Sequence, residues 1–398
     1  MEKLDGNGVG PADLIPRLKD DGYDVERVAR RRQWVERKTG ASLPHIGSAS
    51  FDTEAMRGNI ENPIGVAQVP MGVAGPVEVH GQHAKGLYYV PMATSEGALI
   101  RSYERGMMAL TKSGGVQTAV LADENHTVPS FFFSGVSEAA EFCAWAPQQL
   151  TGMQGAVATT TRHGKLNSIR CYQAGRQVML NLAFSTADAQ GMNMIVKATD
   201  AICQWVEKNY SVASYFLFSG MCSEKRPSGA LLTRGKGKRV TAGALLPHNI
   251  LKMYLHVTAS QLFRVWHSTA IGHLQAGTFG CNAHAANGLT AMFIATGQDV
   301  ANIANSAVAI TNFEIVEDGL YVSTTLPALS VATVGGGTNL PTQREALSIM
   351  GCHGSGKALK FAEIVTAAVL GGEISMGSAI AAGEFVNAHE RYGRNRPK

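Results

Sequence analysis

A long apolar run in the second half of the chain constrains the fold most strongly. Residues 284–310 read HAANGLTAMFIATGQDVANIANSAVAI, and a helix formed by them would be apolar on nearly every side. A helix that is apolar all round has to be buried. The run therefore predicts a long central helix, with a large domain of mixed helix and strand, an α+β fold, built around it.

Composition supports a sizeable core and a surface that is shared with another subunit. Hydrophobic residues make up 45% of the 398 residues, which excludes a globally disordered chain. Charged residues make up 17%, where about a quarter is usual, and there are 44 glycines. We expect tight turns and closely packed backbone at the glycines, and surface lost to a partner subunit.

Several classes of protein are disfavoured by the same residues. The net charge is +4 and no block of six like charges occurs, so nucleic acid is not an expected main partner. The six cysteines form no CxxC spacing, so neither structural zinc nor a disulfide framework is expected, and we predict no metal. The first 30 residues hold no apolar signal segment, and no uninterrupted apolar run reaches 18 residues. We therefore expect a cytoplasmic protein without a membrane span.

Periodicity predicts the order of elements along the chain. Residues 11–40 read as an amphipathic, strongly charged helix, which is either a solvated helix docked by one face or a basic patch that steers an anionic substrate. Alternation over Arg176–Phe184 predicts a strand, and Asp188 is expected to cap a helix that runs to about Lys208. Further predictions are a helix over 94–112, a compact α/β unit over 130–217, a helix over 358–389 and a mobile tail over 390–398.

Four side chains could carry acid–base chemistry. Lys225, in CSEKRPSG, could present an ammonium to a developing oxyanion, although a surface loop is the simpler explanation. Glu96 starts a helix among small residues, where burial would favour a proton donor. Asp299 lies within the apolar run, where a carboxylate must be paired or functional. His389 stands near the C-terminus. Together they suit hydride reduction of a carbonyl with acid catalysis.

Two glycine-containing segments could hold a dinucleotide. Asp188–Met194 follows a strand and opens a helix, whose N-terminal N–H groups suit a pyrophosphate. Gly335-Gly336-Gly337 allows close backbone approach to a ligand, or forms a tight turn. Neither segment is GxGxxG, so a Rossmann domain is not supported.

The motifs that contain these residues resemble those of the 3-hydroxy-3-methylglutaryl-CoA (HMG-CoA) reductase family. The match covers roughly residues 50–395 in the family's order and looks like the catalytic portion of the class I type, in its soluble bacterial or archaeal form. The motifs are ENPIG at 61–65, MATSEG at 92–97, DAQGMNM at 188–194, NAHAAN at 282–287, GQD at 297–299 and GGGT at 335–338.

The resemblance implies a reaction, in which HMG-CoA and two NADPH give mevalonate and free CoA for isoprenoid synthesis. It implies that Lys225 stabilises the oxygen of the thioester and of the aldehyde intermediate, and that Glu96 protonates the reduced carbonyl oxygen. Asp299 would link these two residues. His389 would protonate the departing CoA thiolate.

The resemblance also implies binding residues. Arg162 matches the arginine that reads the 2′-phosphate and so favours NADPH over NADH. The dinucleotide segment is matched by Asp188, Gly191, Met192, Asn193 and Met194, and Gly335, Gly336 and Gly337 are expected beside it. The pocket for the acyl group is matched by Ser219, Glu224, Arg226 and Asn287, with His284 near CoA.

Three positions depart from the family. Thr127 stands where an arginine helps to hold the substrate carboxylate, His267 where many class I members have lysine, and Met221 where asparagine is frequent. Arg226 or His126 could supply the missing charge. Thr127 and His267 motivate a second hypothesis, a paralogue that reduces a different acyl-CoA or aldehyde. A third is a catalytically silent homologue that only binds CoA or a nucleotide, and the joint presence of the four candidate catalytic residues argues against it.

The family's architecture, carried over by resemblance, divides the chain into parts. It implies a large domain around a long central helix, an inserted ferredoxin-like cofactor domain, a C-terminal flap, and a homodimer or homotetramer with active sites between subunits. The expected parts are an N-terminal helical segment 1–49, the large substrate domain 50–128 and 218–375, the NADP-binding insert 129–217, and the C-terminal helix and flap 376–398.

Overall fold

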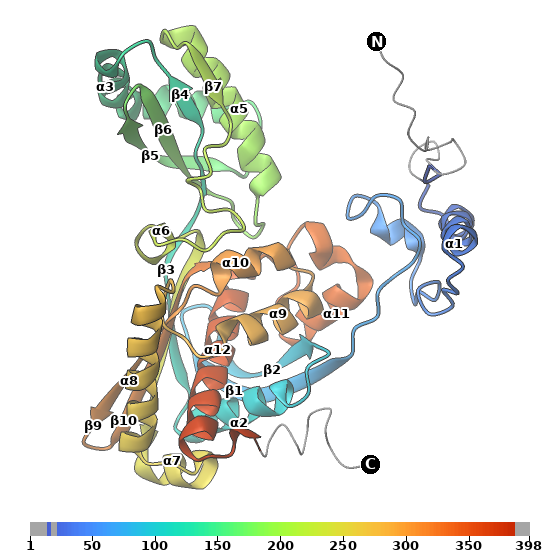
Figure 1. The fold of residues 1–398 in the computed structure, drawn as a ribbon, viewed down its shortest axis with the longest axis vertical. Helices are drawn as coiled ribbons and strands as arrows, with labels where there is room; N and C mark the ends of the chain where they lie inside the picture. Colours follow the sequence, from blue (N-terminus) through green and yellow to red (C-terminus); the bar gives the residue numbers. More distant parts are fainter. Residues whose placement is uncertain (1–13, 17–21, 387–398) are drawn as a thin grey trace.

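The fold was analysed in a computed structural model, which describes residues 14–16 and 22–386. A smaller α/β unit stands above a larger domain, and an N-terminal segment lies to one side of both (Figure 1). His389 and the expected tail over 390–398 lie outside the described residues.

The large domain is built on one face of a mixed sheet, in which only β1 and β3 run parallel. Its strand order is β2-β1-β3-β8-β10-β9. The strands are β1 Met71–His80, β2 Lys85–Ala93, β3 Val116–Thr127, β8 Gly237–Pro247, β9 Ile310–Val316 and β10 Gly319–Leu329. The helices are α2 Leu99–Lys112, α6 Ala230–Thr233, α7 His248–Leu255, α8 Ala259–Ala276, α9 Ala285–Thr296, α10 Ile303–Ser306, α11 Pro341–Ile349 and α12 Ala358–Ala381, with short 3-10 turns η4 Val300–Asn302 and η5 Gly336–Asn339.

The smaller unit has its own sheet and its own core. Strands pair in the order β7-β4-β6-β5, all antiparallel, and bury a cluster that includes Phe131, Phe142 and Leu180. The predicted strand over 176–184 is confirmed as β6. The elements are β4 Ser130–Phe132, α3 Val136–Trp145, η3 Ala146–Gln149, α4 Leu150–Ala158, β5 Lys165–Ala174, β6 Gln177–Ser185, α5 Met192–Asn209 and β7 Ser214–Phe216.

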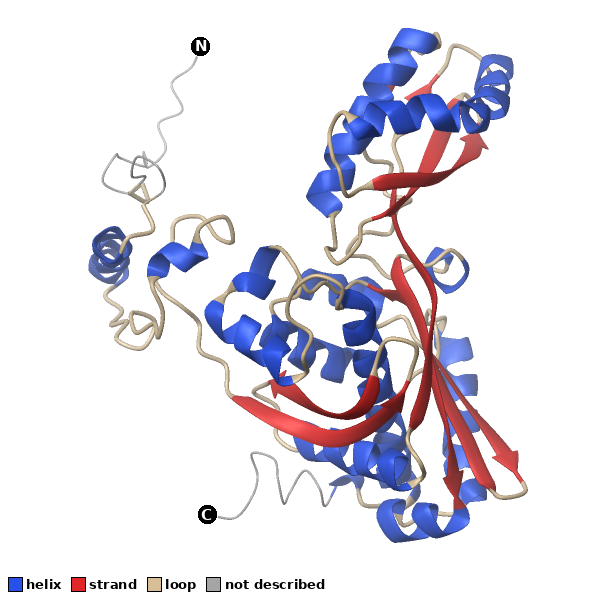
Figure 2. Ribbon diagram, turned by 180° about the vertical axis from the view of Figure 1, so that it is seen from behind, coloured by secondary structure: helices blue, strands red, loops and turns tan. Residues whose placement is uncertain are grey.

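Strand β3 joins the two sheets. Its first part pairs with β8 in the large domain, and its last three residues, Asn125 to Thr127, pair with β6 in the smaller unit. The strand is visible as one long red arrow that passes from one unit to the other (Figure 2). Residues at its end therefore lie where the two units meet.

The long central helix is α12 and not the predicted run 284–310. In that run, α9 stops at Thr296 because Gly297 takes a left-handed conformation (φ 69°), and Asp299 then caps η4. Apolar residues continue past this break because the chain stays inside the core after the helix ends. Among the described residues, α12 is the one helix apolar and long enough to cross a membrane, and 78% of its most apolar window is buried inside the protein, as in a core helix.

Two buried carboxylates on α12 fix neighbouring loops. Glu363 accepts hydrogen bonds from the backbone N–H groups of Gln82, His83 and Ala84 in the β1–β2 turn, at 2.7–3.0 Å. Glu373 accepts from the N–H groups that precede and begin α9 and from the Thr311 hydroxyl. These hydrogen bonds compensate the cost of burying charge in an apolar helix. They also set where the β1–β2 turn and the start of α9 lie.

Three predicted helices are shorter than expected. Helix α1 covers Val25–Thr39 of the range 11–40, with Asp24 as its N-cap. Helix α2 begins at Leu99, so residues 94–98 form a loop that carries Glu96. The last predicted helix, 358–389, ends at Ala381 as α12, so the expected domain boundary at residue 375 falls within it.

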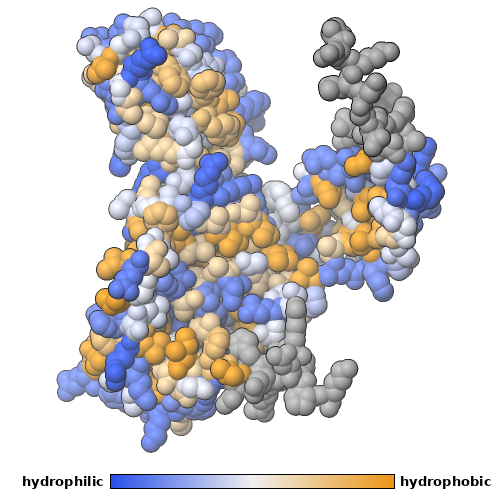
Figure 3. Space-filling model, in the orientation of Figure 1, coloured by the Kyte–Doolittle hydropathy of each residue, from blue (hydrophilic) through white to orange (hydrophobic). Residues whose placement is uncertain are grey.

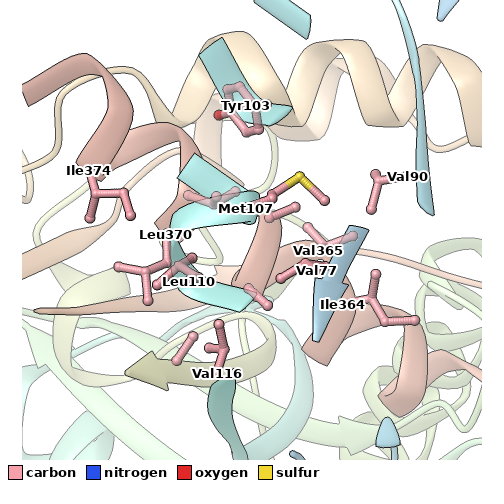
Figure 4. Packing of buried hydrophobic residues seen from close by; sticks show 14 of the residues in the cluster. Val77, Val90, Tyr103, Met107, Leu110, Val116, Ile364, Val365, Leu370 and Ile374 are labelled. Atoms are coloured by element: carbon pink, nitrogen blue, oxygen red, sulfur yellow. The ribbon is translucent and has the colours of Figure 1, made fainter. Parts of the chain in front are cut away.

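Helices α2 and α12 cross at closely packed backbones, amid Tyr103, Met107, Leu370 and Ile374 (Figure 4). A methyl group at Gly106 would overlap the carbonyl oxygen of Gly371, which is backbone and cannot rotate away. We expect Gly106→Ala to lower the free energy of unfolding by about 1–3 kcal/mol, measured by urea unfolding and thermal midpoint.

The matched control for this substitution is Gly155→Ala. Gly155 is also helical, but a methyl group on it would meet nothing within 4 Å. The control should leave stability unchanged or raise it by up to about 1 kcal/mol. Equal stability changes in the two variants would show that the α2–α12 contact is not as close as described.

Candidate active site

Two of the predicted catalytic residues, Lys225 and Asp299, form an ion pair. Lys225 Nζ lies 2.8 Å from Asp299 Oδ2, and both side chains remain about one-third to one-half exposed. The hydrogen bond and charge of Asp299 raise the pKa of Lys225, against a smaller lowering by burial. Lys225 thus presents a protonated ammonium at an accessible position, which suits the stabilisation of a developing oxyanion.

The backbone around Lys225 is held in an unusual conformation. Ser223 and Lys225 both have left-handed φ values, 56° and 55°. Such a conformation costs a non-glycine residue about 1–2 kcal/mol, so surrounding contacts must enforce it. One is the 2.6 Å hydrogen bond between the hydroxyls of Ser223 and Ser228. Asp299 is itself fixed, because it accepts a hydrogen bond from the N–H of Ala301.

Glu96 lies in a different part of the chain's surface. It is exposed in the single chain, which contradicts the expected burial. The side chain of Asn287 donates toward Glu96 Oε1 at 3.5 Å, the limit of a hydrogen bond. Glu96 and Asn287 line a cavity of about 700 Å³ together with His284. The His284 ring is buried against Tyr103, and its Nε2 lies 2.8 Å from the carbonyl oxygen of Gly372.

Helix α9 separates these two groups within one chain. Asn287 stands in its first turn, whereas Asp299 follows its C-terminal end. Twelve helical residues at 1.5 Å each put the two ends roughly 18 Å apart. The four predicted catalytic residues are therefore not brought together in the described chain: Lys225 and Asp299 meet, Glu96 lies apart, and His389 is outside the described residues.

The segment 188–194 has a different cap from the predicted one. Asp188 does not cap α5, whose N-cap is Gly191. The carboxylate of Asp188 instead accepts hydrogen bonds from the N–H groups of Gly356, Lys357 and Ala358 at the start of α12, at 2.7–3.0 Å. Burial raises the pKa of Asp188, but these three hydrogen bonds outweigh it and the net pKa is lowered. Among the described side chains none caps α5, so its first N–H groups have no side-chain acceptor, and a helix start of this kind can donate hydrogen bonds to an anion.

The remaining predicted cofactor residues lie around this helix start. Asn193 is exposed and Met192 and Met194 are half-buried in the first turn of α5. The Met194 methyl lies 3.2 Å from the position of a methyl built on either Gly164 or Gly191. Exposed Arg162 is two residues from Gly164, so the turn that carries it borders the dinucleotide segment.

The three-glycine loop completes this region. The N–H of Thr333 donates to the carbonyl oxygen of Asp188 at 2.9 Å, which fixes the loop beside the dinucleotide segment. Methyl groups on Gly335 or Gly336 would meet open space, whereas one on Gly297 would overlap the backbone of Gly337. The loop therefore packs on the turn that leads to Asp299 and leaves an open backbone face, which fits close approach by a dinucleotide.

Some of the predicted acyl-pocket residues bind other parts of the protein, and others are exposed. The hydroxyl of Ser219 donates to the carbonyl oxygen of Val128 at 2.8 Å. Arg226 is exposed. Glu224 is mostly buried and pairs with Lys236 at 2.7 Å. Neither Lys236 nor the equally buried Lys238 was predicted, although a lysine between two glycines at the start of a strand (GKGK) is a usable signal for a buried cation.

The departures at Thr127, His267 and Met221 are located as well. Thr127 is buried and shares a 2.6 Å hydrogen bond with Thr199, so its side chain does not border the open site. His126 does not compensate with charge, because burial and the nearby cations lower its pKa to about 3. His267 is exposed on α8 and stacks on Phe263. The carbonyl oxygen of Met221 accepts from Arg234. No group of three or more potential metal ligands occurs in the part of the chain that the structure describes.

Both the sequence and the fold are similar to those of known proteins. The family model for hydroxymethylglutaryl-coenzyme A reductase matches residues 27–394. The 3-hydroxy-3-methylglutaryl-coenzyme A reductases of Pyrococcus abyssi and Aeropyrum pernix are 44% and 43% identical, over 92% and 94% of this chain and 92% and 91% of theirs. A solved reductase of Streptococcus pneumoniae matches in fold, with a TM-score of 0.65 at 18% identity, over 89% of this chain and 96% of that one.

These matches place the protein among the oxidoreductases, with a fold of mixed helix and sheet. The chain belongs to the hydroxymethylglutaryl-coenzyme A reductase family.

The anchor formed by Asp188 should be visible in the pH dependence of stability. Because its pKa lies below the ordinary 3.8 in the folded chain, the carboxylate contributes stability above that pH and loses it as pH falls through the lower folded pKa. We expect Asp188→Asn to lower the free energy of unfolding at pH 7 by about 1–3 kcal/mol. The difference from the parent should shrink as pH falls below 4, measured by thermal unfolding.

Asp200→Asn is the control, since Asp200 accepts a hydrogen bond from the Gln204 side chain on the exposed surface of α5 and lies away from α12. A stability gap for Asp188→Asn that is equal at pH 7 and pH 3 would contradict the anchoring role.

Proposed function

We propose that the chain reduces HMG-CoA to mevalonate and free CoA with two NADPH. Two hydrides and two protons are consumed for each thioester, and the sulfur leaves as the CoA thiol. The observation that supports this most directly is the Lys225–Asp299 pair beside the segment 188–194. Membership of the reductase family supplies the substrate class. A reductase of Streptococcus pneumoniae has been solved with NADPH bound.

The residues of this chain have separate tasks in the reaction. Lys225 holds the oxygen of the reacting carbonyl, which gains charge as the carbon is reduced, and Asp299 keeps the ammonium oriented. NADPH, when bound, supplies the hydride. The free N–H groups of α5 and the open face of Gly335 and Gly336 would hold it, with Arg162 at the 2′-phosphate.

A second copy of the chain completes the site. Glu96, His284 and Asn287 line a cavity at the far end of α9 from Lys225, so one chain holds two incomplete halves. In the proposed homodimer or homotetramer, Glu96 of one subunit donates the proton to the oxygen held by Lys225 of the other. Apolar side chains left exposed on α8, Ile271 and Leu274, are candidates for this interface; orange areas mark apolar surface in Figure 3.

Finer assignments belong to the same proposal. The chain is of the class I type, a proposal supported by 34% identity to a Dictyostelium discoideum reductase against 18% to the class II reductase from Streptococcus pneumoniae. Residues 129–217 form a ferredoxin-like insert. The support is the element order β4-α3-α4-β5-β6-α5-β7, which is β-α-β-β-α-β with the first helical segment divided in two by η3. The expected C-terminal helix and flap over 376–398, with His389, stay a prediction. The protein acts in the cytoplasm, in isoprenoid synthesis.

The direct test is the product of the purified protein. We expect NADPH oxidation to depend on HMG-CoA, with two NADPH consumed for each mevalonate and each free thiol. Lys225→Ala should lower kcat by at least about 10²-fold, with the fold kept because Lys225 is half exposed. Much faster turnover of another acyl thioester would favour the paralogue hypothesis, and NADPH or CoA binding without any turnover would favour the silent homologue.

A shared site predicts complementation between two inactive variants. Glu96→Gln and Lys225→Ala should each be inactive alone. If the protein is a dimer and the two variants are co-expressed in equal amounts, half of the dimers are mixed, and each mixed dimer has one intact site of two. Activity should therefore recover to roughly a quarter of the parent value. The two variants assembled separately and assayed together before any subunit exchange are the control. No recovery in purified mixed dimers would contradict a site built from two copies.

A further inference from the structure

Lys236 is a fully buried cation that the reaction described above does not use. It lies in the turn before β8, and its side chain has no exposed surface. Its ammonium lies 2.7 Å from Glu224 Oε2 and donates to Asn125 Oδ1 at 2.8 Å and to the carbonyl oxygen of His126 at 3.3 Å. A buried ammonium with these three oxygen partners is well compensated, but removal of the Glu224 carboxylate would leave an uncompensated charge.

The partners of Lys236 form a closed ring of polar contacts. Glu224 Oε1 accepts from the side-chain amide of Gln190 at 3.4 Å. The carbonyl oxygen of Gln190 accepts from the side-chain amide of Asn125 at 2.9 Å, and Asn125 returns to Lys236. Four segments therefore meet here: the turn before β8, the loop before α6, the dinucleotide segment, and the end of β3.

The ring bears directly on the residue that carries the chemistry. Glu224 precedes Lys225, whose left-handed backbone must be enforced by its surroundings. Glu224 is mostly buried, with 16% of its side chain exposed, whereas the Lys225 side chain is about half exposed. The Lys236–Glu224 contact is thus a buried, charged attachment of the loop directly beside Lys225, in addition to the hydrogen bond from Arg234 to the carbonyl oxygen of Met221.

We propose that Lys236 is a positioning residue for the reaction: through Glu224 it fixes the loop that presents Lys225, and through Asn125 it ties that loop to the dinucleotide segment. The proposal rests on the function given above. It assigns Lys236 no contact with substrate or cofactor. Loss of its charge displaces Lys225, and a displacement of about 1 Å can cost about 10²-fold in rate.

Three variants test the assignment. Lys236→Met keeps the length of the side chain and removes the charge, and Lys236→Arg restores a cation. Lys238→Met is the matched control, because Lys238 is equally buried in the neighbouring part of β8, yet it pairs with Asp123, which is outside the ring. Kinetics with HMG-CoA and NADPH are measured together with hydrogen–deuterium exchange over residues 219–229.

The expected result is a loss in kcat with local loosening of the loop. Lys236→Met should lower kcat about 10²-fold, while KM for NADPH changes less than about threefold, since Asn125 still donates to Gln190. Exchange over 219–229 should rise at least about tenfold. Lys236→Arg should recover kcat to within about tenfold of the parent, because a guanidinium does not reproduce an ammonium's geometry. Lys238→Met should leave loop exchange as in the parent.

The proposal is overturned if folded Lys236→Met keeps kcat within about threefold of the parent, if its loop exchange is unchanged, or if Lys238→Met loosens the loop equally. Should Lys236→Met fail to fold, Glu224→Gln breaks the same attachment from the other side, and its loop exchange decides the question. If the parent reduces no thioester at all, the proposed function fails, and the exchange comparison still decides whether Lys236 holds the loop.

Discussion

The carboxylate of Asp188, which caps the central helix of the other domain, is the interaction on which the site depends. Its three hydrogen bonds to the start of α12 attach the smaller unit to the large domain at one point. Asp188 is turned to α12, and among the described side chains none caps α5. The Asp188 carbonyl also holds Thr333 before the glycine loop, which packs on the turn to Asp299. Asp188 thus fixes the segment 188–194 and the glycine loop, which we propose bind the dinucleotide, and through that loop the turn to Asp299.

Buried charge is used in this fold to fix backbone. Glu363 and Glu373 project from an apolar helix and are each bound by backbone N–H groups, which removes the cost of their burial and fixes the ends of neighbouring elements. Lys236 does the same with carboxylate and amide oxygens at the junction of the units. The charges that would meet substrate, on Lys225, Asp299 and Glu96, are exposed instead. Their full desolvation would come with the substrate and a second subunit.

The sequence predicted the family, the β6 strand and the smaller α/β unit, because motif identity and period-2 alternation are local properties. It misplaced the central helix. Gly297 ends α9 within a run whose apolar pattern continues, and periodicity cannot separate a buried helix from a buried turn. The hydrogen bonds from α12 to Asp188 and from Lys236 to Asn125 join residues more than a hundred positions apart. They could not be predicted, because the sequence does not show which distant segments meet. The expected burial of Glu96 was wrong because α2 begins only at Leu99, which leaves residues 94–98 as a loop in which Glu96 is exposed.

We propose above all that one chain carries two half-sites, at opposite ends of α9, and that two chains join them. An experimental structure of the protein with CoA and NADPH bound tests this most directly. We predict Glu96 of one subunit within hydrogen-bonding reach of the Lys225–Asp299 pair of another, with Asn287 beside it. A complex in which Glu96 and Lys225 of the same chain line one site, or in which no second chain borders the bound CoA, would contradict it.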